Sequence, residues 1–245
     1  MNLLGIIGFP LTHSFSKQYF TEKFQRENIE GYRFDAFELK TIAEITTLIT
    51  ETPSLKGFAV TIPYKQQILS YLDFATPDVK AMKACNCVYI VEGKLYGYNT
   101  DVLGFEQSLK PMLQPHHNKA LILGTGGAAQ AVAYVLGKLG IDFLFVSRNE
   151  LQNKNCINYT NLSQQIIEEN TLIINASPVG TFPNINEAPT IPYQFITPQH
   201  YCFDLIYNPP QTKFLALSEK QKAITKNGFD MLAIQAEANW EIWNS

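Results

Sequence analysis

Charge is scarce in this sequence, and the scarcity excludes several classes of function. Only 17% of the 245 residues are charged, and 19 basic against 22 acidic side chains leave a net charge of −3. A chain with no basic excess lacks the electrostatic attraction that nucleic acid or an anionic membrane requires. Because 46% of the residues are hydrophobic, the composition indicates a globular protein with a substantial core, in one large domain or two small ones.

Metal-binding and redox motifs are also absent from the sequence. The four cysteines and four histidines form neither a CxxC nor an HExxH spacing, so we expect reduced, packed thiols and no bound metal. His116 and His117 are adjacent, but they lie in a polar stretch where we expect an exposed loop rather than a metal pair.

No signal peptide or membrane span is evident. The apolar stretch from Leu3 to Pro10 has no basic residue before it and is interrupted by glycines. We therefore expect a cytoplasmic protein with no membrane partner.

Hydrophobic periodicity predicts an α/β protein made of two modules. Strands alternate with amphipathic helices, and a polar segment at 114–118 separates a first module from a second whose alternation implies a parallel sheet. The strands are expected at 3–8, 32–38, 56–62, 87–91, 94–98, 119–123, 143–147, 171–176 and 201–205. The helices are expected at 17–28, 42–50, 103–112, 128–139, 163–168 and 231–243.

A glycine loop at the start of the second module predicts a nucleotide site. Gly124, Gly126 and Ala129 form a G-x-G-x-x-A pattern between a predicted strand and a predicted helix. The first glycine permits a tight turn, the second lets backbone N–H groups reach a pyrophosphate, and the alanine keeps helix and strand close. A purely structural turn is the alternative reading.

The end of the next strand predicts which dinucleotide binds. Arg148 stands where NAD enzymes usually carry an acidic residue for the ribose 2′-hydroxyl. A guanidinium can hold a 2′-phosphate by two charge-assisted hydrogen bonds, so the sequence favours NADP over NAD. An arginine that merely lies on an exposed loop is the alternative.

Polar side chains also gather near the predicted strand ends of the first module. Each has an ordinary structural explanation: Ser16 as a helix N-cap, Lys65 as a solvated lysine, and Asn99 to Asp101 as a turn. Together with Ser14, Thr61 and Asn86, however, they suit a small hydroxylated acid. The residues alone thus indicate an NADP-dependent oxidoreductase acting on a polyol or hydroxy acid.

In this order, the segments resemble the shikimate dehydrogenase family across nearly the whole chain. The matching segments are Ser14-Phe15-Ser16, Val60 to Lys65, Asn86, Asn99-Thr100-Asp101 with Gly104, the Gly124 loop, Asn175 to Gly180, Asp204 to Pro209, and Asn227-Gly228 followed by Met231-Leu232 and Gln235-Ala236. The family reduces 3-dehydroshikimate to shikimate with NADPH, so the resemblance implies the same substrate and cofactor here.

The resemblance also implies roles for individual residues. Lys65 and Asp101 would form the catalytic pair. The substrate would be held by Ser14, Ser16, Thr61, Asn86, Tyr207 and Gln235. The cofactor would be lined by Gly124, Gly126, Gly127, Ala128, Ala129, Gln130, Ser147, Arg148, Asn149, Leu205 and Gly228.

The family architecture sets the expected domains. A substrate domain at 1–101, completed by the helix at 229–245, would accompany a Rossmann-like NADP-binding domain at 102–228, with the active site in the cleft between them. The family includes monomers and homodimers, and both stay open. No metal is implied.

The chain departs from the family pattern in several places, and two of them concern substrate and 2′-phosphate contacts. Ala59 stands where the family usually has an asparagine, and Asn149 ends a segment that usually reads Asn-Arg-Thr. The polar stretch between Asn149 and Ser163 is short and poor in helix formers, so we expect the family's helix there to be missing or reduced to a turn.

Two other functions stay open at the level of sequence. A quinate/shikimate dehydrogenase with relaxed cofactor use differs in the recognition of one hydroxyl. A non-catalytic sensor that binds shikimate and NADP would keep the fold without turnover, although the presence of both Lys65 and Asp101 argues against it.

Overall fold

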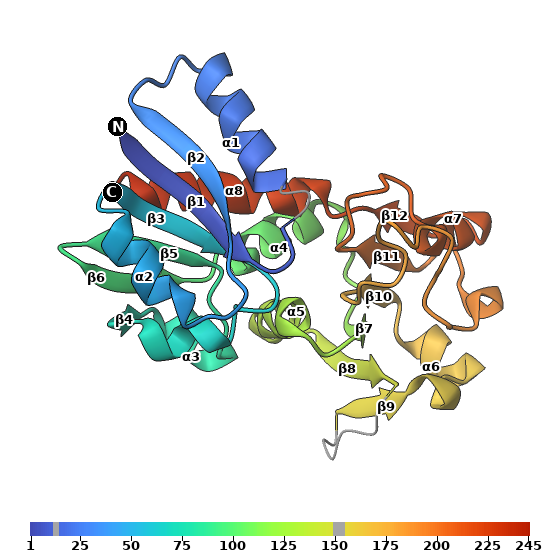
Figure 1. The fold of residues 1–245 in the computed structure, drawn as a ribbon. Helices are drawn as coiled ribbons and strands as arrows, with labels where there is room; N and C mark the ends of the chain where they lie inside the picture. The colour runs from blue at the N-terminus through green and yellow to red at the C-terminus, as the bar shows by residue number, and fades with distance from the viewer. Residues whose placement is uncertain (12–14, 149–154) are drawn as a thin grey trace. The chain divides into compact units, whose positions relative to one another are not determined.

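The computed structural model describes residues 1–11, 15–148 and 155–245 (Figure 1). The chain forms two compact units. Unit 1 comprises Met1–Thr100 with Gln235–Ser245, and unit 2 comprises Asp101–Ile234. Each unit contains one six-stranded sheet with helices packed on it, so the predicted α/β class is confirmed.

The sheet of unit 1 is mixed, with strand order β2-β1-β3-β5-β6-β4. Its first three strands are parallel: β1 (Asn2–Gly8) lies between β2 (Tyr32–Glu38) and β3 (Leu55–Val60). The remaining strands are β5 (Cys87–Val91), antiparallel to both β3 and β6, then β6 (Lys94–Tyr98) and the short β4 (Phe74–Ala75). The turn between β5 and β6 places Glu92 and Gly93 at positive φ, as the predicted hairpin requires.

Helices cover both faces of this sheet because β1 alternates its apolar side chains. Leu3 and Ile7 belong to a core shared with α2 (Glu44–Glu51) and α3 (Pro77–Met82). On the other face, Leu4 and Ile6 pack with α1 (Phe15–Arg26) and the C-terminal part of α8 (Phe229–Trp243). Figure 1 shows the pairs α1/α8 and α2/α3 on opposite sides of the strands.

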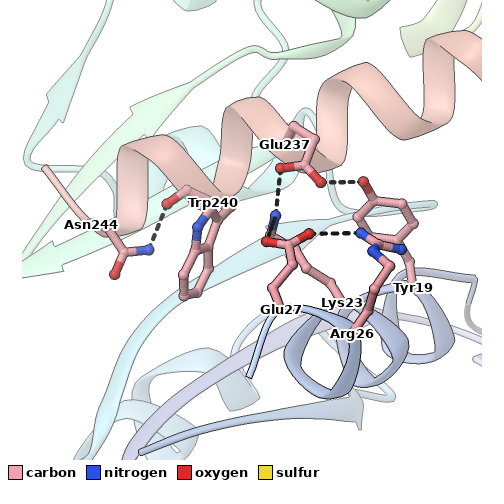
Figure 2. A network of polar contacts seen from close by, with 7 residues as sticks. All are labelled: Tyr19, Lys23, Arg26, Glu27, Glu237, Trp240 and Asn244. Atoms are coloured by element: carbon pink, nitrogen blue, oxygen red, sulfur yellow. Dashed lines mark hydrogen bonds and ion pairs between the residues drawn. The ribbon is translucent and has the colours of Figure 1, made fainter. Parts of the chain in front are cut away.

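A cluster of charged and aromatic side chains joins α1 to α8 (Figure 2). The Lys23 ammonium lies 2.8 Å from carboxylate oxygens of both Glu27 and Glu237, and Tyr19 donates a hydrogen bond to Glu237. Lys23 is only 4% exposed, and its ammonium also lies 5.8 Å from the Trp240 ring centroid. Burial disfavours the Lys23 charge, but the two carboxylates reverse this and raise its pKa. The cluster therefore fixes α8 against α1.

The sheet of unit 2 is wholly parallel, with strand order β12-β11-β10-β7-β8-β9. Its strands are β7 (Lys119–Leu123), β8 (Asp142–Ser147), β9 (Cys156–Asn158), β10 (Leu172–Asn175), β11 (Tyr201–Asp204) and β12 (Ile224–Lys226). From β7 the chain adds β8 and β9 on one side and β10 to β12 on the other. The order thus reverses beside β7, where open α/β sheets bind their ligands.

The helices of unit 2 are α4 (Asp101–Leu109), α5 (Gly127–Lys138), α6 (Gln164–Glu169) and α7 (Lys213–Lys220). Between β8 and α6, residues 155–163 hold β9 and a single 3-10 turn, Tyr159–Asn161. This described part of the stretch holds no α-helix, and residues 149–154 lie outside the described residues.

The two adjacent histidines differ in environment, and this corrects one expectation. His116 is exposed, but His117 is 2% exposed, so the predicted exposed loop is wrong for His117. Its Nδ1 accepts from the Gln114 N–H at 2.9 Å, and Nε2 lies 3.1 Å from the Gln199 carbonyl oxygen. Burial lowers the pKa of His117 and so favours the neutral ring, although the hydrogen bond to the Gln199 carbonyl acts in the opposite direction. The sequence does not reveal these backbone partners.

The four cysteines, all within the described ranges, form no disulfide, and three of them are buried. Among the same residues no cluster of three or more histidine, cysteine or acidic side chains is placed to hold a metal ion. Nor does any helix there have the length and apolar character needed to cross a membrane.

Candidate functional site

The glycine loop after β7 forms the first part of the site in unit 2. Gly124 has φ +109°, and a Cβ at this position would lie 3.2 Å from the Ala176 carbonyl oxygen. Its N–H donates to the Val146 carbonyl at 2.9 Å. The left-handed conformation and the close approach both require glycine, so the tight turn predicted from the sequence is present.

The start of α5 offers a place for an anionic group. Gly126 precedes the helix, and a Cβ built on it would meet no atom within 4 Å. Ala129, by contrast, is fully buried against the sheet. The N–H groups of the first turn, at Gly127, Ala128 and Ala129, have no acceptor inside the helix, and the helix dipole adds partial positive charge there. Gln130 closes the first turn by donating its N–H to the Gly126 carbonyl at 3.1 Å.

The end of β8 lies at the same edge of the sheet. β7 and β8 are parallel, with Leu123 opposite Val146, so Ser147 ends β8 and Arg148 follows it at the edge where the glycine loop follows β7. Ser147 is half-buried and Arg148 is exposed, with the Arg148 carbonyl accepting from Asn158 Nδ2 at 3.0 Å. Asn149 lies outside the described residues.

On the other side of β7, two predicted cofactor residues are in contact. A Cβ on Gly228 would lie 2.1 Å from the Leu205 carbonyl oxygen, so only glycine fits there. The Gly228 N–H donates to the Ile206 carbonyl at 3.1 Å, which joins the segment after β12 to the segment after β11. Tyr207 follows directly, and burial raises its pKa.

A buried carboxylate holds this second segment. Asp204 accepts hydrogen bonds from Asn175 Nδ2 at 3.0 Å, the Ile206 N–H at 3.0 Å and the Thr212 hydroxyl at 2.6 Å. Desolvation nevertheless raises the pKa of Asp204 to about 6. Sequence reasoning placed Asp204 in a family motif without a role; its position directly after three buried strand residues was the available signal.

In unit 1, Thr61 and Lys65 lie in the turn after β3. Tyr64 anchors the turn, because its side chain is buried and its hydroxyl donates to the Leu39 carbonyl at 2.5 Å. The Lys65 carbonyl accepts from the Cys85 N–H at 2.8 Å. Thr61 and Lys65 are themselves half-buried, so the turn presents a hydroxyl and an ammonium from a fixed backbone.

Asn86 and Thr100 form a buried pair beside this turn. Asn86 Oδ1 accepts from the Thr100 N–H at 2.7 Å, and Asn86 Nδ2 donates to Thr100 Oγ1 at 3.0 Å. The Asn86 carbonyl also accepts from the Val60 N–H at 2.8 Å, at the end of β3. Because Cys85 bonds the Lys65 carbonyl, the Asn86 segment is tied to Lys65 as well as to Thr100.

Asp101 begins α4 directly after Thr100. Consecutive Cα atoms are ~3.8 Å apart across a trans peptide, so the Asp101 backbone adjoins the Asn86–Thr100 pair by covalent geometry alone. Asp101 is 6% exposed. A carboxylate in the first turn of a helix is favoured by the helix dipole.

Gln235 and a residue that the sequence reasoning missed continue the network. Thr100 Oγ1 donates to Asn239 Oδ1 at 2.7 Å, and Asn239 Nδ2 donates to Gln235 Oε1 at 3.4 Å. Gln235 and Asn239 are four residues apart on α8 and share one helix face. That spacing was the signal that could have identified Asn239.

Of the two serines predicted to bind substrate, only Ser16 lies within the described residues. Ser16 is 8% exposed and is the second residue of α1, so the alternative that it caps the helix is wrong. Ser14 lies outside the described residues. Ala59, which replaces the family's usual asparagine, is buried in the apolar core that α1 shares with β1 and supplies no polar group.

The structure thus links several of the predicted residues within each unit. In unit 1 the segments of Thr61, Lys65, Asn86 and Gln235 are linked by backbone and side-chain hydrogen bonds. In unit 2 the Gly124 loop, Arg148, Leu205 and Gly228 follow strands of one parallel sheet.

Comparison with known proteins identifies relatives over nearly the full length of the chain. Residues 6–88 match the family model described as the shikimate dehydrogenase substrate binding domain. A shikimate dehydrogenase (NADP(+)) of Methanococcus maripaludis is 35% identical over 257 residues, which cover 98% of this chain and 91% of the relative.

Solved structures give the same result. Shikimate dehydrogenase 1 of Peptoclostridium difficile is 35% identical with a TM-score of 0.84, and the match covers 100% of this chain and 92% of that one. The shikimate 5-dehydrogenase of Thermus thermophilus, solved in complex with NADP(H) and shikimate, is 26% identical with a TM-score of 0.87, covering 99% and 93%.

Proposed function

The chain belongs to the shikimate dehydrogenase family, and from that premise we propose that it catalyses the reversible, NADPH-dependent reduction of 3-dehydroshikimate to shikimate. One observation carries the proposal. Lys65 and Asp101, distant in sequence, are both tied to Asn86: the residue before Asn86 bonds the Lys65 carbonyl, and Asp101 follows the threonine that Asn86 holds.

The residues of unit 2 fit a dinucleotide phosphate. The open space above Gly126, the N–H groups at the start of α5 and the glycine at positive φ suit a pyrophosphate, and the exposed guanidinium of Arg148 suits a 2′-phosphate. We propose Gly124, Gly126 to Gln130, Ser147 to Asn149, Leu205 and Gly228 as the lining residues. When bound, the nicotinamide supplies or accepts the hydride.

Lys65 and Asp101 are proposed to handle the proton of the reaction. As the substrate carbonyl is reduced, its oxygen must gain a proton, and the Lys65 ammonium donates it; in the reverse direction the amine takes it back. Asp101 orients the ammonium through a carboxylate interaction. The Lys65 carbonyl is held by the Cys85 N–H, and Asp101 follows Thr100, which Asn86 holds, along the chain.

The other polar residues are proposed to hold the carboxylate and the hydroxyls of the substrate. These are Ser14, Ser16, Thr61, Asn86, Tyr207 and Gln235. Buried Ala59 offers no contact where the family usually has an amide, so these six carry the recognition without it.

The expected domain roles stay part of this proposal. Residues 1–101 with 229–245 are assigned to the substrate and residues 102–228 to NADP, and the family match over 6–88 supports the first assignment. We place the enzyme in the cytoplasm, where NADPH and small-molecule substrates are available, as a monomer or a homodimer.

The proposal is tested by incubating the purified chain with shikimate and NADP⁺ and recording NADPH absorbance. Turnover with a higher kcat/KM for shikimate than for quinate, and for NADP⁺ than for NAD⁺, is the expected result. Equal use of quinate would favour the broader dehydrogenase. Binding of shikimate and NADP⁺ without turnover would overturn the enzymatic proposal in favour of a sensor.

A further inference from the structure

A directional hydrogen-bond relay runs through unit 1 from a backbone N–H. The Thr100 N–H can only donate, so the Asn86 atom 2.7 Å from it must be the acceptor Oδ1. The other end of the same amide, Nδ2, then faces Thr100 Oγ1 at 3.0 Å and donates to it. The orientation of the Asn86 amide is therefore set by the main chain.

The Thr100 hydroxyl in turn sets the orientation of the Asn239 amide. Its oxygen accepts from Asn86, and its single proton is left for another acceptor. Asn239 Oδ1 lies 2.7 Å away and Asn86 Oδ1 lies 3.2 Å away, so the shorter contact to Asn239 takes the proton. Because Asn239 presents its oxygen to Thr100, its Nδ2 is the atom that faces Gln235.

The relay ends by selecting one end of the Gln235 amide. Asn239 Nδ2 donates to Gln235 Oε1 at 3.4 Å, so the opposite end of the Gln235 amide is Nε2, a pure donor. The four side chains are between 1% and 8% exposed. If one of these buried amides were turned over, its NH₂ group would face another donor or its oxygen would face another acceptor. Bulk water does not reach these groups to replace the lost hydrogen bonds.

We propose that Asn239 is a positioning residue, which fixes Gln235 so that its Nε2 donates to an oxygen of the substrate. The inference rests on the proposed function, in which Gln235 binds shikimate. α8 is itself held in place by the contacts of Glu237 with Lys23 and Tyr19 (Figure 2), so Asn239 acts from a fixed helix.

The substitution Asn239→Asp tests this with almost no change of shape. Aspartate still accepts from Thr100, but its second oxygen cannot donate, so Gln235 turns Nε2 toward it and presents Oε1 to the substrate. We expect the KM for shikimate to rise about tenfold or more, with the KM for NADP⁺ unchanged and kcat within about twofold. Asn239→Ala, which merely releases Gln235, serves as the second variant if the aspartate form does not fold, and should raise the same KM by a few-fold.

A double-mutant cycle separates positioning from a merely structural effect. In a Gln235→Ala background, Asn239→Asp should raise the KM for shikimate no further, because the residue through which it acts is gone. Asn244→Ala is the matched control: this exposed asparagine near the end of α8 donates to the Trp240 carbonyl at 2.7 Å, and its loss should leave both KM values unchanged.

The outcomes distinguish this inference from the function beneath it. Wild-type protein that does not oxidise shikimate overturns the proposed function, and the inference falls with it. Wild-type turnover together with an unchanged shikimate KM in both Asn239 variants overturns the inference alone. A shikimate KM that still rises in the Gln235→Ala background also overturns it.

Discussion

The two units of this molecule build their candidate ligand sites from different material. In unit 2 the site is largely backbone, and three glycines without side chains shape it. Gly124 permits a turn at positive φ, Gly126 leaves open space before α5, and Gly228 allows close contact with the Leu205 backbone. In unit 1 the site consists of side chains from four separate segments, joined by the Asn86–Thr100 pair and Asn239. A backbone site needs only small residues at fixed spacing, whereas a side-chain site depends on long-range packing.

The contrast has a functional meaning. A dinucleotide offers phosphates that many N–H groups can bind, so a helix end and a glycine turn suffice. A small polyhydroxylated acid must be told apart by individual hydroxyls, which requires directed donors and acceptors. A substitution that changes the kinetics for one ligand alone supports this comparison between the units, and a substitution that changes them for both ligands contradicts it.

The largest effect is expected from Lys65→Ala in unit 1. Loss of the proposed proton donor should lower kcat by about 10²–10⁴-fold, with a much smaller change in the KM for shikimate. Steady-state kinetics of shikimate oxidation measure both. Lys56→Ala removes an exposed lysine from the neighbouring strand and should leave kcat unchanged; a Lys65→Ala enzyme with near-normal kcat would remove Lys65 from the chemistry.

The second effect concerns stability in unit 2, where Asp204 is a side chain with a structural role. Its pKa is raised from 3.8 to about 6 in the folded protein, so between these values the folded state binds more protons than the unfolded state. Its contribution to the free energy of unfolding is fully present below pH 3.8 and is lost as the pH rises through 6. The loss is on the order of 1–3 kcal/mol.

Asp204→Asn should abolish that pH dependence. Urea unfolding of wild type and variant between pH 4 and pH 7 (about one pH unit beyond the upper pKa) gives the difference in unfolding free energy at each pH. Wild type should lose stability relative to the variant as the pH rises. A constant difference across this range would show that Asp204 keeps an ordinary pKa.

The third effect separates two glycines of the α5 segment. Neither Gly126 nor Gly137 would place a Cβ within 4 Å of another atom. Gly126→Ala should fold but raise the KM for NADP⁺ by roughly 10–30-fold, because the methyl group enters the space assigned to the pyrophosphate. Gly137→Ala should leave that KM unchanged and stabilise the helix by about 0.5–1 kcal/mol. Equal KM values for the two variants would move the phosphate site elsewhere.

The smallest effect is expected from Arg148→Ala. Removing the guanidinium should lower kcat/KM for NADP⁺ about tenfold and leave kcat/KM for NAD⁺ nearly unchanged, because only NADP⁺ carries the 2′-phosphate. Arg33→Ala, in which an exposed arginine of unit 1 loses its ion pair with Asp35, is the control. A parallel fall with both cofactors would place Arg148 at a part of the nucleotide that they share.

Local pattern made much of the fold predictable. The strand at β7 is a run of buried apolar residues and the strand at β1 alternates between two cores, and both were located from the sequence. The short helices α3 and α7 and the short strands β9 and β12 were not, because a few residues give too little periodicity. His117 was misjudged because its burial depends on backbone partners far along the chain.

The candidate site was also only partly predictable from the sequence. The Gly124 loop and Arg148 follow from spacing alone, since their function needs only a strand, a turn and a helix in succession. The roles of Lys65 and Asn86 came from the family resemblance, and Asn239 was missed. Its contact with Thr100 spans 139 residues and depends on how α8 packs in unit 1.

The division of labour between the units is tested most directly by measuring both KM values in two variants, Gly126→Ala and Gln235→Ala. With the second substrate saturating in each case, Gly126→Ala should raise only the KM for NADP⁺, and Gln235→Ala only the KM for shikimate. If either variant raised both KM values equally, or if Gln235→Ala raised the KM for NADP⁺ instead, this division of labour would be contradicted.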